Sequence, residues 1–388
     1  MITWKTKLTL LLTSTMTIMS GTAIIASLPM IKEHFADEVG VELLSRIILT
    51  APAIAIAFFA PWSNAVASRF GKKRTLIVAL IFFGFFGVMG AWMQSIQGIV
   101  ISRLLFGVSV ALMMSLSLSL VGDYLKDSER IKYLGYQNTF VALGGVMFMA
   151  GGGFLSQISW QGAFYIYGIG WIVAILAWRY IVEPPIETIK ETDERPARVM
   201  RHWSIFITAL ATMSIFYMVP SQLPYVLHES YAMPASQVGL LMATVTFVSA
   251  ITSLFYNRLR KRWNIKTIYA LVFCVQGVGF LGLGFSTSYL QFNASLIAIG
   301  IGVGFVIVNT NSWLLESAQP YERLKATGWL SSSIFMGQFL SPLILYLPTT
   351  LMGISNSFIL MGIVLGSVGL FLSFRAIRQR YRSLGYFW

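Results

Sequence analysis

The chain has 388 residues, of which 56% are hydrophobic and 11% charged, and its mean hydropathy is +0.72. Soluble domains carry about 25% charged residues, so this composition excludes an ordinary soluble enzyme and a secreted domain. The net charge of +13 would by itself suggest nucleic-acid binding, but membrane proteins also collect Lys and Arg in their cytoplasmic loops. The single cysteine, Cys274, excludes a disulfide framework and a multi-cysteine metal site.

Twelve apolar runs follow one another along the chain, each close to the ~20 residues that a helix needs to cross a bilayer. We expect these spans at 8–30, 45–67, 75–93, 98–121, 134–156, 162–182, 203–226, 236–256, 267–286, 293–315, 327–348 and 356–374. The first run is longer than the core of a cleaved signal peptide, ~7–15 residues, so we expect it to be retained. The sequence therefore predicts an all-α integral membrane protein with twelve transmembrane helices.

A polar stretch, 183–202, separates the sixth apolar run from the seventh. It divides the chain into an expected N-terminal six-helix bundle (1–182), a linker (183–202) and a C-terminal six-helix bundle (203–388). With both termini on one side of the membrane, the connections on that side hold all but three of the 28 Lys and Arg residues. The positive-inside rule then predicts that both termini and the linker are cytoplasmic, in a multi-pass protein of the bacterial inner (plasma) membrane. The net positive charge is thus explained by the orientation of the protein in the lipid bilayer, and we expect no nucleic-acid partner.

The two halves repeat one pattern at an offset of 193 residues. SRFGKK at 68–73 falls on KRWNIK at 261–266, and SERIKYLG at 128–135 falls on YERLKATG at 321–328. Many transporters are built from such repeats. Two bundles of the same topology suit alternating access, in which the halves rock about a solute site near the middle of the membrane.

These motifs resemble the major facilitator superfamily over essentially the whole chain. The loop after the second run is similar to the family's Gly-x-x-x-Asp-Arg-x-Gly signature, with matches at Arg69, Gly71, Lys72, Lys73 and Arg74 but with Asn64 and Ser68 at the usual Gly and Asp. RLLFG at 103–107 resembles the arginine motif of the proton-driven branches, and GGVMFMAGGGF at 144–154 resembles the glycine-rich motif of the antiporters. The resemblance implies a twelve-span exporter of drugs or metabolites.

Arg103 is the one charge well inside an expected span. Burying an ionised group in hydrocarbon costs about 3 kcal/mol on insertion scales, so such a residue is a functional candidate by default. Its guanidinium either faces the cavity of the N-terminal bundle, near a proton site or an anionic group of the solute, or is held by carbonyl groups of the first span.

Other polar side chains within the spans are candidates for contact with the solute. Each of them either lines a cavity or joins two helices, because a polar group in hydrocarbon needs a partner. The polar candidates are Ser20, Thr22, Gln137, Asn138, Tyr217, Asn309 and Asn311, and Met113 is the candidate for an adaptable apolar contact.

Two acidic residues end the fourth and tenth runs beside basic loops. We expect Asp123 to pair with Arg69, and Glu316 with Arg262, as a latch that closes the cytoplasmic side together with Gly71 and Lys73. The alternative is that these charges only anchor the helix ends beside lipid head groups.

The sequence predicts a secondary active transporter, a proton-coupled exporter of a small amphipathic solute such as a drug-like compound or a siderophore, acting as a monomer. No Asp or Glu lies deep in a span, so any coupled proton is expected on Glu42, Asp123, Glu229 or His228 at the edges. An uncoupled or uptake-type facilitator of a metabolite is the alternative. A membrane-embedded enzyme is a remote one, because the three histidines lack metal-ligand neighbours at helical spacing. We expect no metal and no cofactor.

Overall fold

The computed structural model describes residues 3–125, 127–184, 199–319 and 322–383, so most of the expected linker lies outside the described residues. The first half of the chain, called the N half below, contains these helical segments: α1 (Trp4–Thr22), η1 (Ile25–Ser27), α2 (Leu28–His34), α3 (Val41–Phe59), η2 (Ala60–Trp62), α4 (Ser63–Phe70), α5 (Lys72–Met89), η3 (Gly90–Trp92), α6 (Ile96–Tyr124), α7 (Asp127–Ile158), α8 (Gly162–Tyr165), η4 (Ile166–Gly168) and α9 (Ile169–Tyr180).

The second half, called the C half, contains η5 (Val199–His202), α10 (Trp203–Phe216), α11 (Met218–Tyr225), η6 (Val226–Ser230, a π-helical turn), α12 (Ala235–Leu254), α13 (Tyr256–Arg260), α14 (Ile265–Phe285), α15 (Tyr289–Ser317), α16 (Arg323–Met352) and α17 (Ile354–Ser383). The described residues form 12 helical stretches long and apolar enough to cross a membrane. The prediction of an all-α, twelve-span fold is therefore confirmed.

The 193-residue repeat reappears in the ends of the helices. Ser95 caps α6 by accepting a hydrogen bond from the amide of Gly98, and Ser288 caps α15 by accepting one from the amide of Gln291. Each of these two helices is 29 residues long. A serine in the N-cap position satisfies an amide that the helix itself cannot, so the duplicated sequence starts the duplicated helix at the same place.

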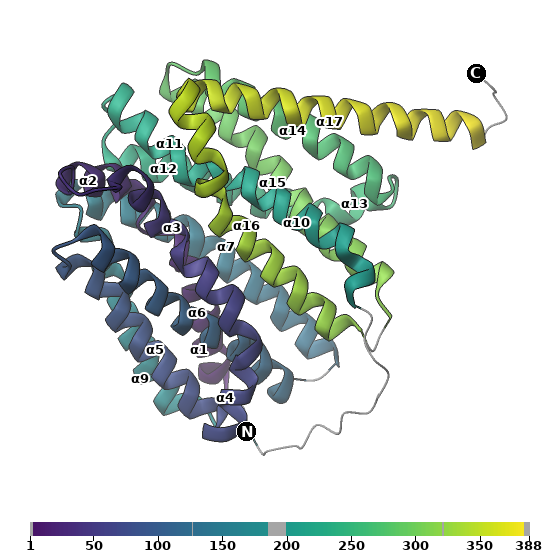
Figure 1. Ribbon diagram of the computed structural model, residues 1–388. Helices are drawn as coiled ribbons and strands as arrows, with labels where there is room; N and C mark the ends of the chain where they lie inside the picture. The colour runs from purple at the N-terminus through teal and green to yellow at the C-terminus, as the bar shows by residue number, and fades with distance from the viewer. Residues whose placement is uncertain (1–2, 126, 185–198, 320–321, 384–388) are drawn as a thin grey trace.

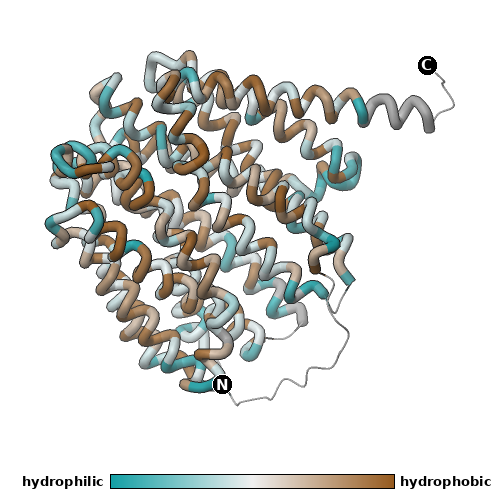
Figure 2. Tube along the Cα trace, viewed as in Figure 1, coloured by the Kyte–Doolittle hydropathy of each residue, from teal (hydrophilic) through white to brown (hydrophobic). Residues whose placement is uncertain are grey.

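Hydrophilic residues gather at the two ends of the helices, as the teal segments in Figure 2 show. We call one end the basic face, which carries the Lys and Arg residues at 69–74, 258–266 and 323–325, and the other the acidic face, which carries Glu33, Asp37, Glu38, Glu42 and Glu229. In Figure 1 the acidic face lies at the upper left, beside α2, and α4 and α13 mark the basic face.

The two halves meet along two helix pairs. α7 of the N half packs on α12 of the C half, and α3 packs on α16, while shorter contacts join α11 to α2, α3 and η1. The largest buried apolar cluster continues from one half into the other, from Leu10 in α1 to Leu365 in α17. These contacts place α2, α3, α7, α11, α12 and α16, together with η1, at the boundary, where a site shared by both halves would lie.

Candidate functional site

The first span of each half is broken at an equivalent position. α1 ends at Thr22 and the chain continues through η1 into α2, whereas α10 ends at Phe216 and continues through α11 into the π-helical turn η6. The two breaks face each other, because a Cβ atom added to Gly21 would lie 3.2 Å from the hydroxyl of Tyr217. Interrupted helices at corresponding positions of two repeats are the pattern of transporter binding sites. Of the predicted polar candidates, Ser20, Thr22 and Tyr217 lie at these breaks.

A close glycine contact joins the halves toward the acidic face. A Cβ added to Gly153 of α7 would lie 2.9 Å from the Cα of Gly239 in α12 and 2.7 Å from the carbonyl oxygen of Ala235. Small residues allow helix backbones to approach this closely in membranes. Toward the middle of the spans, the hydroxyl of Thr246 donates to the sulfur of Met149 at 3.3 Å, and that of Ser332 donates to the carbonyl of Ala57 at 3.4 Å.

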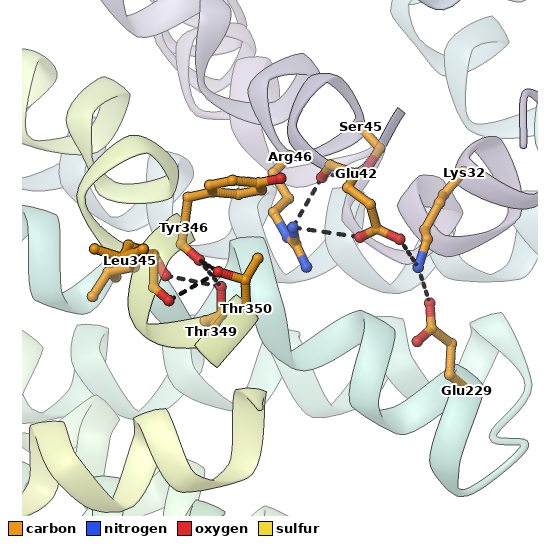
Figure 3. Close-up of polar contacts among 10 residues, drawn as sticks. Lys32, Glu42, Ser45, Arg46, Glu229, Leu345, Tyr346, Thr349 and Thr350 are labelled. Atoms are coloured by element: carbon orange, nitrogen blue, oxygen red, sulfur yellow. Dashed lines mark hydrogen bonds and ion pairs between the residues drawn. The ribbon is translucent and has the colours of Figure 1, made fainter. Parts of the chain in front are cut away.

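Ion pairs cross between the halves at the acidic face. The ammonium of Lys32 lies 2.8 Å from a carboxylate oxygen of Glu229, and Nε2 of His228 lies 3.1 Å from a carboxylate oxygen of Glu33. We call these four residues the acidic-face clasp. Lys32 also lies 2.8 Å from Glu42 of its own half, so it bridges two carboxylates, as Figure 3 shows. Three of the residues predicted as proton candidates, Glu42, Glu229 and His228, thus meet at this cluster.

At the basic face, every ion pair of the described chain joins residues of one half. Lys72 pairs with Asp123 at 2.6 Å and Arg260 pairs with Glu316 at 2.9 Å. The other two pairs at this face are Lys7 with Glu129 and His202 with Glu322. The described halves are therefore tied by charge at the acidic face and not at the basic face.

The predicted latch partners were wrong. Asp123 pairs with Lys72 because Lys72 begins α5, which packs against α6, whereas Arg69 lies exposed in the last turn of α4 over the ring of Phe70. In the C half, Glu316 contacts Arg260 of α13. The predicted partner, Arg262, instead lines an open cavity with Arg258, Lys261 and Phe305.

Glu183, which sequence reasoning missed, belongs to the same loop network. Its carboxylate accepts hydrogen bonds from the backbone amides of Lys72 and Lys73, at 2.6 and 3.0 Å, and so caps the N-terminus of α5. Gly71 permits this contact, because its φ is +90° and an added Cβ would lie 3.0 Å from Glu183. An acidic residue after the sixth apolar run was the available signal.

Arg103 is fully buried inside the N half. Its Nη2 donates to the carbonyl oxygens of Phe86 and Gly87 in α5, at 3.1 and 2.7 Å. The rings of Phe106, Phe164 and Tyr167 surround the guanidinium within 5.0 Å of their centres. One of the two alternatives left open by the sequence placed carbonyls of the first span around Arg103; the carbonyls that hold it come from α5 instead. All of these contacts lie within the N half, so in this conformation the guanidinium is enclosed by its own half.

Two more candidates, Asn309 and Gln137, hold helices together within one half, and a third, Met113, lies in the core. Asn309 donates to the carbonyl of Ile265 at 3.1 Å and accepts from the hydroxyl of Tyr256 at 3.0 Å. Gln137 donates to the hydroxyl of Ser14 at 2.7 Å, which ties α7 to α1. Met113 is fully buried.

The remaining candidates have only local bonds or exposed side chains. Asn311 donates to the carbonyl of Ile307 in its own helix at 2.8 Å, and Thr22 donates to that of Ile18 at 3.1 Å. Asn138 is exposed on α7, and Ser20 is half-buried. Asn138 and Ser20 therefore stay candidates on position alone.

Sequence reasoning also missed a buried polar layer between α3 and α11. Arg46 is 5% exposed, so Arg103 is not the one deeply placed charge. The error came from starting the second span at 45, whereas α3 starts at Val41 and places Arg46 inside it. The Arg46 guanidinium lies 5.3 Å from the ring centre of Tyr225 in α11, and Thr50 and Gln222 are fully buried nearby in the same two helices.

Twelve spanning helices, two repeated halves and a boundary with paired helix breaks define a multi-pass membrane transport protein. The family model of the Major Facilitator Superfamily matches residues 10–221 and 204–385. The chain belongs to this superfamily and is a transporter, as the sequence motifs predicted. Among the described residues, no group of three or more His, Cys, Asp and Glu side chains is placed to hold a metal ion.

Curated relatives include drug resistance proteins. The chain is 25% identical over 270 residues to the tetracycline resistance protein, class B, of Escherichia coli, covering 66% of this chain and 67% of the relative. It is 22% identical over 307 residues to the quinolone resistance protein NorA of Staphylococcus aureus (strain MRSA252), covering 77% of this chain and 79% of the relative.

Solved structures with the same fold include transporters of other kinds. A bacterial homologue of the human lysosomal transporter Spinster, in an inward-facing and occupied conformation, superposes with a TM-score of 0.76 at 16% identity, covering 96% of both chains. A D-xylose-proton symporter superposes with a TM-score of 0.75 at 13% identity, covering 95% of this chain and 97% of that one. At these identities the likeness establishes the fold alone.

Proposed function

We propose that the protein exports small amphipathic molecules from the cytoplasm by alternating access, in exchange for protons. The observation that carries this proposal is the distribution of ion pairs among the described residues, which cross between the halves at the acidic face and stay within each half at the basic face. With the basic face in the cytoplasm, as the positive-inside rule predicts, this arrangement is closed to the outside. Such a conformation accepts solute from the cytoplasm. The relatives named for tetracycline and quinolone resistance support export.

The transport step is a rocking of two bundles, 1–182 and 203–388, about the helix breaks at Gly21 and Tyr217. To release solute outside, the acidic-face clasp separates and the Gly153–Gly239 contact parts. The linker at 183–202 joins the bundles on the cytoplasmic side, and one chain holds the complete site, so a monomer suffices.

Among the three proton candidates at the acidic face, charge favours His228. Glu229 must be ionised to hold Lys32 across the halves, so its protonation opposes closure. Glu42 binds Lys32 within the N half, so its protonation breaks no pair between the halves. Protonation of His228, which faces Glu33, creates an ion pair and favours closure. An antiporter must close its outer side after taking up a proton from outside. Of the two candidates whose ion pairs join the halves, Glu229 and His228, only His228 has that sign.

The test is efflux from proteoliposomes of the wild-type protein under an imposed pH gradient, with tetracycline, a quinolone and ethidium as solutes. We expect at least one solute to move against its gradient and to stop when the pH gradient is collapsed. If the solute moves at the same rate with and without the pH gradient, the protein is a facilitator and not a proton-coupled exporter. No movement of any solute in either direction would contradict the proposal. The His228→Asn variant should lose the dependence on pH while still exchanging solute down its gradient.

A further inference from the structure

The polar layer between α3 and α11 contains buried groups without hydrogen-bond partners in the part of the chain that the structure describes. These are Nε of Arg46, the hydroxyls of Thr50 and Tyr225, and both amide atoms of Gln222. The side chains of Thr50 and Gln222 are fully buried, and that of Arg46 is 5% exposed. Buried polar groups in folded proteins are nearly always paired, so a set of unpaired ones at one place points to a ligand.

Arg46 and Tyr225 of this layer meet across the boundary of the halves, with the guanidinium 5.3 Å from the ring centre. Thr50 lies four residues after Arg46 in α3, and Gln222 lies three residues before Tyr225 in α11, so each pair shares one helix face. Because Arg46 stacks on Tyr225 and the helices are antiparallel, Thr50 and Gln222 lie at a common level, one turn deeper into the membrane.

Neighbouring groups leave Arg46 short of acceptors. Its Nη1 donates to the carbonyl of Glu42 at 3.0 Å, but the Glu42 carboxylate is 3.6 Å away and is bound by Lys32. In Figure 3, Thr349 and Thr350 of α16 lie on the other side of Arg46. Their hydroxyls donate to carbonyls of their own helix at 2.8–3.0 Å. Among the described residues, the guanidinium therefore has the ion pair with Glu42 at 3.6 Å and no carboxylate within hydrogen-bond distance.

Opening of the acidic face changes the charge at this place. Glu229 belongs to the C half and leaves with it, so the N half keeps Lys32 and Arg46 against Glu42 alone. Glu33, released from His228, is 60% exposed at the rim, where solvent screens it. A partly buried site with two cations and one carboxylate favours an added anion, and the planar guanidinium fork of the buried Arg46 fits a carboxylate in particular.

We propose that Arg46 and Lys32, with Thr50 and Gln222 one turn deeper, form a binding site for the carboxylate of an organic-anion solute when the acidic face opens. The solute carboxylate takes the place of Glu229 on Lys32 and meets the unpaired Nε of Arg46. The inference rests on the alternating access proposed above, because the site is closed in the present conformation. It narrows the transported class to molecules with an apolar body and a carboxylate.

The test uses 2-naphthoate as the probe and 2-naphthamide as its neutral match of the same shape. Binding to the purified full-length protein is measured by equilibrium dialysis without a gradient. We expect wild type to bind 2-naphthoate more tightly than 2-naphthamide. The Arg46→Gln variant should lower the affinity for 2-naphthoate at least about tenfold and change the affinity for 2-naphthamide by less than about twofold. Arg46→Lys should recover only part of the loss, because lysine lacks the fork. Arg258→Gln, at an exposed arginine of the basic face, is the matched control.

A second variant acts in the opposite direction and guards against a folding defect in Arg46→Gln. Glu229→Gln removes the competing carboxylate and loosens the clasp, so it should tighten 2-naphthoate binding several-fold. Any one of three results would contradict the site. These are equal affinity of wild type for the two probes, an equal loss of affinity for both probes in Arg46→Gln, and no gain in affinity for 2-naphthoate in Glu229→Gln. A protein that exports ethidium but fails these tests would contradict this site alone. One that passes them but moves no solute would contradict the exporter alone.

Discussion

Substitution of Gly153 by alanine should shift the protein away from the conformation closed at the acidic face. The added methyl group would lie 2.7 Å from the carbonyl oxygen of Ala235 and 2.9 Å from the Cα of Gly239, whereas ordinary contacts of a Cβ start at 3.4 Å. Both obstacles are backbone atoms of the other half, so no side chain can turn aside. α7 and α12 must move apart by roughly half an ångström or more at this crossing.

The cost falls on one conformation only, because Gly153 meets the C half and not its own. Overpacking of this kind costs about 1–3 kcal/mol. A change of that size in the balance between two conformations corresponds to a ~5–150-fold shift in their ratio. Gly151, two residues earlier in the same helix, provides the control, since an added Cβ there would meet only Ile166 Cδ1 at 3.6 Å.

A cysteine introduced at Ser45 reports the shift. Ser45 is fully buried in α3, and Cys274 is replaced by serine so that the reporter is the single thiol. Labelling of Ser45→Cys by an impermeant thiol reagent added outside intact cells should be ~5–150-fold faster with Gly153→Ala and unchanged with Gly151→Ala. Equal labelling rates in the two backgrounds would refute the reasoning, because the glycine contact would then not hold the acidic face closed.

Three further predictions concern the faces, the buried arginine and the basic loop. In intact cells carrying Cys274→Ser, an impermeant reagent should label Asp37→Cys at the acidic face and spare Glu129→Cys at the basic face, and the reverse result would invert the orientation. Arg103→Ala should lower the stability of the purified protein by roughly 3 kcal/mol, since two charge-assisted hydrogen bonds to Phe86 and Gly87 are lost, and an unchanged melting temperature would contradict this. Lys72→Ala should slow solute efflux more than Arg69→Ala, because Lys72 forms an ion pair with Asp123, whereas Arg69 has no ion pair in the described chain. Equal efflux rates of the two variants would show that the ion pair does not contribute to transport.

The sequence by itself determined the elements and their duplication. Hydropathy is summed over about 20 neighbouring residues, and a helix cap involves residues three apart, so both are local properties. The sequence therefore predicted the twelve spans and the 193-residue offset. The equivalent caps at Ser95 and Ser288 follow the same offset and could have been predicted from it.

Tertiary structure alone decided which charges meet. Lys32 and Glu229 are 197 residues apart, and nothing local to either indicates the other. Arg69 and Lys72 belong to one short loop, yet only Lys72 reaches Asp123, because Lys72 begins a helix that packs beside that of Asp123. Arg46 looked like an edge residue until the start of α3 at Val41 and the ring of Tyr225 placed it in a buried layer. A side chain reaches only a few ångströms, so the rotation and depth of each packed helix select its partners, and these come from the packing of the whole bundle.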